Sequence, residues 1–108
     1  MSRNNNDGNY DMPSIQKGET TSLAVVESDN IFGYPYFTIR RWTLSDNELC
    51  MIVDEGEVRI SGFGLLKLSD SIQTQTLKVL RVVPHSIASD RAGEPVVTGH
   101  TFREFENE

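Results

Sequence analysis

Short runs of apolar and β-branched residues, separated by turn-forming residues, fill the chain from Ser22 onward. Turns recurring at intervals of about ten residues are typical of antiparallel sandwiches and barrels. We therefore expect one mainly β domain over residues 22–108, built as a small antiparallel barrel or sandwich of about six strands. The predicted strands lie at residues 23–27, 36–44, 49–53, 57–61, 76–83 and 96–105.

Two of these runs carry a clear burial pattern. Polar and apolar residues alternate strictly from Glu57 to Ser61, which predicts a strand with one face in water. The run from Leu77 to Val83 has apolar residues at both odd and even positions, as a strand covered on both faces would. We expect this second run to lie in the middle of the core.

The segment 45–55 fits two structures. Ser45 and Glu48 match a capping box, and the apolar residues that follow fall at helical spacing up to Gly56. Against a helix, residues 50–53 form an unbroken apolar run, and a helix here would end on Asp54 and Glu55, which oppose its dipole. A strand is favoured, and a short helix remains the alternative.

Residues 1–21 are rich in Asn and other polar residues and offer little apolar area to bury. Because so little burial offsets the entropy of ordering, this segment is expected to be a flexible arm. It has no apolar stretch of the kind found in signal peptides, which suggests an uncleaved cytosolic start. Residues 85–94, between Pro84 and Pro95, are expected to form one helical turn or a loop.

Composition narrows the class of protein. The chain of 108 residues has a net charge of −6 and a pI near 4.8, so sequence-independent electrostatic binding to duplex DNA is not expected. Cys50 is the only cysteine, which rules out an intrachain disulfide and favours a reducing, cytoplasmic setting. No apolar run is long enough to span a bilayer.

No residue pattern predicts an enzyme, a metal or a cofactor. His85 and His100, with nearby acidic residues, match no zinc spacing. Cys50 lies in an apolar run and is expected to be a buried, unreactive core residue. Residues 62–64 lack the Lys and Ser or Thr of a phosphate loop and predict a tight turn or bulge.

Five of the nine aromatic residues lie between Phe32 and Trp42. If residues 36–44 form one strand, Tyr36, Arg40 and Trp42 share a face, while Phe37 and Ile39 point to the core. Tyr, Trp and Arg dominate interface hot spots, although the same face could pack under a loop with Arg on Trp. Phe32 and Tyr34 are expected in a loop that contains Gly33 and Pro35, where burial is less certain. The candidate partner-binding residues are Phe32, Tyr34, Tyr36, Arg40 and Trp42.

These features predict a non-catalytic interaction module, a small subunit of a larger assembly that binds another protein or itself through this face and the N-terminal arm. One alternative is a single-strand nucleic-acid binder with an OB or SH3-like barrel. In it the aromatic face would stack bases, and phosphates would meet Lys67, Lys78 or Arg81. The other is an acidic inhibitor or immunity protein that acts through Asp54, Glu55 and Glu57.

Overall fold

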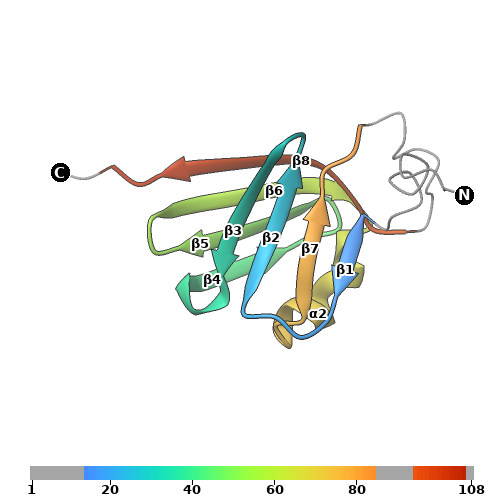
Figure 1. Ribbon diagram of the computed structural model, residues 1–108, viewed down its shortest axis with the longest axis horizontal. Helices are drawn as coiled ribbons and strands as arrows, with labels where there is room; N and C mark the ends of the chain where they lie inside the picture. The colour runs from blue at the N-terminus through green and yellow to red at the C-terminus, as the bar shows by residue number, and fades with distance from the viewer. Residues whose placement is uncertain (1–13, 85–93, 107–108) are drawn as a thin grey trace, which may run out of the picture.

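A computed structural model describes residues 14–84 and 94–106, which form two four-stranded β-sheets packed face to face (Figure 1). The first sheet contains, in spatial order, β1 (Ile15–Lys17), β7 (Leu77–Arg81), β2 (Ser22–Glu27) and β3 (Asn30–Pro35). The second contains β4 (Ile39–Leu44), β5 (Glu48–Val53), β6 (Gly56–Phe63) and β8 (Val96–Glu104). Three short helical segments complete it: η1 (Tyr36–Thr38), η2 (Leu65–Leu68) and α2 (Ser69–Gln73).

The two sheets form a sandwich, which confirms the mainly β class. In the second sheet every neighbouring pair is antiparallel, whereas in the first β2 and β7 run parallel, so the prediction of about six wholly antiparallel strands is wrong: the described residues contain eight strands and one parallel pair. Strands of the first sheet run across those of the second (Figure 1). The sheets are joined at one corner by a bridge between Val82 and Val97 and do not close into a barrel.

Alternation along the strands places the core between the sheets. On β6, Val58 and Ile60 are completely buried, while Arg59 between them is exposed, as the sequence predicts. β7 lies between β1 and β2, so its predicted place inside a sheet is confirmed, but the prediction that both its faces are covered is wrong because Lys78 is exposed. Leu77 and Leu80 both face inward because the β1–β7 pairing shifts register between them, which lets residues three apart share a face.

Residues 48–53 of the ambiguous segment form β5, so the favoured strand is confirmed. The Ser45 hydroxyl accepts a hydrogen bond from the Glu48 backbone N–H at 3.1 Å, which is the capping-box contact used in a turn. The Ser45 N–H donates to the Glu48 carbonyl at 2.8 Å and closes the connection between β4 and β5. A local side-chain bond therefore fits a turn here as well as a helix start.

Other sequence predictions need correction. Residues 15–17 pair with β7, so the predicted arm contains a strand; residues 1–13 lie outside the described residues, as do 85–93. Residues 30–35 form β3 where a loop was expected, and 36–38 form a 3₁₀ turn where a strand was expected. Residues 69–73, which lie between two predicted strands, form α2. Within the described ranges, no helix is long and apolar enough to cross a membrane.

Gly62 confirms the predicted bulge. The register between β6 and β8 shifts between Ser61 and Gly62. A Cβ on Gly62 would lie 1.9 Å from the Val96 carbonyl oxygen, closer than any real contact. Glycine is therefore required here by the close approach of β8, which seats that strand against the second sheet.

Candidate functional site

The predicted aromatic face on residues 36–44 does not form. Tyr36 is buried, and its hydroxyl donates to the Leu77 carbonyl at 2.5 Å. Trp42 is half-buried and packs against the core opposite Met51. Phe37, expected in the core, is 80% exposed. The 3₁₀ turn and a register shift between Ile39 and Arg41 reset the alternation, so the prediction of one shared face is wrong.

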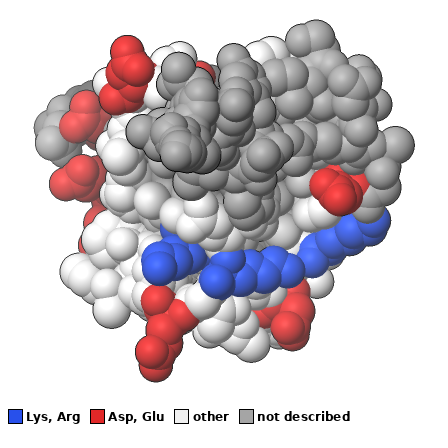
Figure 2. All heavy atoms as spheres, turned by 45° about the vertical axis from the view of Figure 1, so that its right-hand side comes forward, with Lys and Arg blue, Asp and Glu red and all other residues white. Residues whose placement is uncertain are grey.

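The loss of this face also removes the base-stacking row that the nucleic-acid alternative requires. Figure 2 shows Lys and Arg side chains in a row on the side of the molecule where Figure 1 places β1, β7 and α2. Exposed lysines on these and adjoining elements are Lys17, Lys67 and Lys78. Tyr36 and Trp42 turn toward the core, so this strand offers no aromatic row for bases beside those lysines.

The other two candidate residues, Phe32 and Tyr34, lie on β3 and belong to a groove with a volume of about 570 Å³. The groove runs between β3, the turn that joins β5 to β6, and the end of β8. Its lining is mostly apolar and includes Ile31, Phe32, Gly33, Tyr34, Pro35, Thr38, Val53, Asp54, Glu55 and Phe102. Ile31 is 72% exposed and Phe102 is 40% exposed, which makes this an apolar surface open to a partner.

His100 on β8 fixes the wall of the groove to the second sheet. The Tyr34 hydroxyl and His100 Nε2 are 2.8 Å apart, and His100 Nδ1 lies 3.5 Å from a carboxylate oxygen of Glu27. The Phe32 ring centroid is 4.7 Å from that of the His100 ring. Since the His100 side chain is almost fully buried, these contacts hold β3 in place relative to β8.

The same surroundings keep the Tyr34 hydroxyl protonated. Burial raises the pKa of Tyr34, and the negative charge of Glu27 raises it further. The neutral hydroxyl can donate to Nε2 of His100, whose Nδ1 faces Glu27, so the hydrogen bond joins β3 to β8. We interpret Tyr34 and His100 as residues that position the groove.

The rim of the groove is acidic. Asp54 and Glu55, its two charged lining residues, form the turn between β5 and β6. Arg40 reaches Asp54 with its Nε at 2.5 Å, so one of the two carboxylates is partly neutralised. Glu57, grouped with them in the sequence, points to the opposite, outer face of the second sheet, so the expected acidic cluster is divided between two faces.

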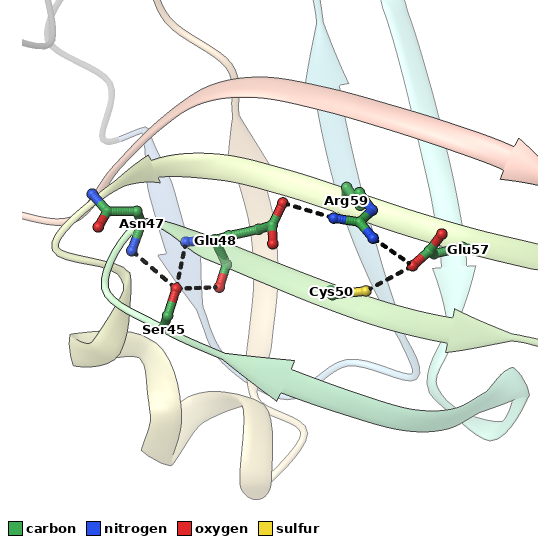
Figure 3. A network of polar contacts seen from close by, with 6 residues as sticks. All are labelled: Ser45, Asn47, Glu48, Cys50, Glu57 and Arg59. Carbon is green, nitrogen blue, oxygen red and sulfur yellow. Dashed lines mark hydrogen bonds and ion pairs between the residues drawn. The ribbon is translucent and has the colours of Figure 1, made fainter.

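That outer face carries a polar network around Cys50 (Figure 3). Arg59 bridges Glu48 and Glu57 with two N···O distances of 3.2 Å. The Cys50 thiol donates to the same Glu57 oxygen at 3.2 Å. Cys50 is half-exposed and lies opposite Thr43 and Arg59, so its predicted place in the core is wrong; alternation, which puts Leu49 and Met51 inward, turns it outward.

The network disfavours a reactive thiolate. Partial burial raises the pKa of Cys50, and the hydrogen bond to Glu57 and its charge raise it further. The pKa of Glu57 is lowered, first by accepting the thiol hydrogen and then by Arg59. The neutral thiol therefore fits a surface polar network.

The described residues also bring together no group of three or more His, Cys, Asp or Glu side chains able to hold a metal ion. His85 and the nearby acidic residue Asp90, which the sequence analysis considers as metal ligands, lie outside the described residues. His100 has both ring nitrogens engaged, by Tyr34 and Glu27.

Of the candidate residues named from the sequence, Phe32 and Tyr34 line the groove, whereas Ile31 and Phe102, which also line it, are not among those candidates. Phe102 faces inward because it pairs with buried Val58, yet it stays exposed because it lies beyond the cover of the first sheet. Alternation gave the orientation of this residue, but only the packing of the sheets reveals its exposure. In comparisons with known proteins, no family model, no curated protein and no solved structure matches this chain.

Proposed function

We propose that this protein is a non-catalytic interaction module, a small subunit of a protein assembly that binds a segment of another protein in the groove beside β3. The observation that carries the proposal is an open, mostly apolar groove whose wall is fixed by Phe32, Tyr34 and His100. A preorganised wall lowers the entropic cost of binding, since little of the protein must become ordered.

The edges of the two sheets support β3 as the binding element. β1 has three residues and ends on Lys17, and β4 carries two arginines and a register shift. β8 carries His100, Arg103 and Glu104. Short length, charges, prolines and bulges are features that protect strand edges from unwanted pairing. β3 has six residues, no charged side chain and a proline only at its last position, so among the described edge strands it is the least protected.

Selection from a displayed library of random twelve-residue peptides would test this function. We expect peptides enriched on the whole chain to bind the Phe102→Ala variant about tenfold or more weakly, as hot-spot truncations do. Leu66→Ala is the matched control, because Leu66 is also an exposed apolar residue but lies on η2. Equal weakening by both variants, or no enriched peptide, would contradict the proposed function.

A further inference from the structure

We propose that the partner segment binds as an additional strand on the free edge of β3, and that it carries Lys or Arg side chains toward the acidic turn at residues 54–55. This inference rests on the proposed function, because it specifies how the groove is occupied. Three observations support it. Some backbone N–H and C=O groups of β3 face away from β2, the inner face of the second sheet is uncovered beside β3, and the rim of the groove is acidic.

The register of the β2–β3 hairpin determines which backbone groups are free. Glu27 pairs with Asn30 across a two-residue turn, so these two residues exchange backbone hydrogen bonds. Alternation along the ladder then gives the same role to Phe32 and Tyr34. The N–H and C=O groups of Ile31 and Gly33 point away from β2, toward the edge.

The position of Pro35 agrees with this assignment of paired and free backbone groups. Pro35 pairs with Ser22 at a position where the backbone nitrogen faces away from β2, so its missing N–H costs the ladder no hydrogen bond. Among the described residues, no strand pairs with the other side of β3, which is the last strand of its sheet. An extended peptide therefore meets two free N–H groups and their carbonyls along this edge.

The second sheet provides the floor for such a strand. Figure 1 shows β6 and β8 extending past β3 toward the C-terminus. On this inner face Val58 has no exposed surface, whereas its partner Phe102 is 40% exposed. A Cβ on nearby Gly56 would lie 2.9 Å from the end of the Phe102 ring, so a glycine leaves room for that ring. A strand added beside β3 would cover Phe102.

The acidic rim of the groove favours a segment of another protein over a second copy of this chain. Pairing two β3 edges would bring two acidic turns, each with Asp54 and Glu55, to one interface between molecules of net charge −6. A segment with Lys or Arg meets this rim favourably, and Glu55 has no ion-pair partner among the described residues. The occupant is therefore a basic, extended segment of another protein.

Gly33 permits a matched pair of variants. Gly33→Pro removes one N–H from the free edge, while Gly33→Ala keeps it, and a Cβ at this position has no atom within 4 Å. The probe is the displayed twelve-residue library, selected separately on the parent chain and on each variant. We expect parent-selected peptides to be enriched in Lys, Arg and β-branched residues, to bind Gly33→Ala unchanged and to bind Gly33→Pro about tenfold more weakly.

The outcomes separate this inference from the proposed function. Peptides lost on Phe102→Ala but retained on Gly33→Pro would keep the groove and overturn strand addition. Selected peptides without basic residues would overturn the charge assignment. A dimer that sediments as such at micromolar concentration, and that Gly33→Pro dissolves, would make a second copy the occupant. Failure to select any groove-dependent peptide would overturn both proposals.

A second measurement keeps the test valid if Gly33→Pro does not fold. N-methylation of single backbone amides in a selected peptide leaves the protein unchanged and removes one donor at a time. Strand addition predicts that methylation weakens binding at every second residue of the peptide and has little effect between them. Uniform sensitivity, or none, would overturn the inference.

Discussion

β3 and β4 are both edge strands of six residues, and both arise from the aromatic segment that begins at Phe32, yet they present opposite surfaces. β4 has two exposed arginines and a register shift at its start, and it turns Trp42 toward the core. β3 is regular and uncharged, and it lies beside an apolar groove. Aromatic content alone therefore does not distinguish the two edges, and the proposed binding edge rests on the absence of protecting charges on β3.

Trp42→Ala is expected to have the largest effect, and it tests whether Trp42 on β4 belongs to the core and not to a binding surface. Because Trp42 packs against the core, we expect truncation to lower the free energy of unfolding by about 3 kcal/mol, with little change in peptide affinity for the molecules that remain folded. Urea denaturation and a binding titration measure the two quantities. A normal melt with lost binding would restore Trp42 as an interface residue, as the sequence hypothesis has it.

His100→Ala tests whether the wall of the groove depends on the second sheet. Removing the imidazole leaves the buried Tyr34 hydroxyl without its partner, at a cost of about 2 kcal/mol in stability. We also expect weaker peptide binding, since β3 loses its contact with β8. Thr101→Ala, on the outer face of the same strand, should change neither quantity. If affinity stays at the parent value in His100→Ala, the wall needs no such support.

The sequence predicts elements whose burial follows a local pattern, but it does not predict features that depend on contacts between distant segments. Alternation at residues 57–61 and the apolar run at 77–83 predicted β6 and β7 because such patterns reflect burial directly. For residues 30–35 the sequence predicts a loop, because Gly33 and Pro35 disfavour strands in general. Both are suited to this edge, where one side of the backbone faces away from the sheet. The groove depends on how far β8 extends past β3, which no local pattern encodes.

Alkaline unfolding sharpens the contrast between core and edge tyrosines. Burial raises the pKa of Tyr36 to about 12, and the pKa of Tyr34 is also raised by burial and by Glu27. A raised tyrosine pKa means that the folded state favours the neutral form, so its stabilising contribution is complete below pH 10 and is lost as pH rises toward 12. Each tyrosine contributes a slope of up to about 1.4 kcal/mol per pH unit.

Tyr36→Phe should flatten this slope while lowering stability near pH 7, because the hydrogen bond to Leu77 is lost. Denaturant titrations at pH 7, 10 and 11 measure both effects. Parallel curves for parent and variant would show that Tyr36 does not control alkaline stability.

Arg40→Ala has the smallest expected effect and tests the charge of the rim. The ion pair with Asp54 is largely exposed, so its loss should change stability by less than about 0.5 kcal/mol. Releasing Asp54 increases the negative charge at the groove, and we expect a basic peptide to bind about threefold more tightly. Arg41→Ala is the control for net charge, because Arg41 pairs with Ile52 on the outer face. Weaker binding in Arg40→Ala alone would mean that Arg40 contacts the partner directly, which would return one residue of β4 to the binding site.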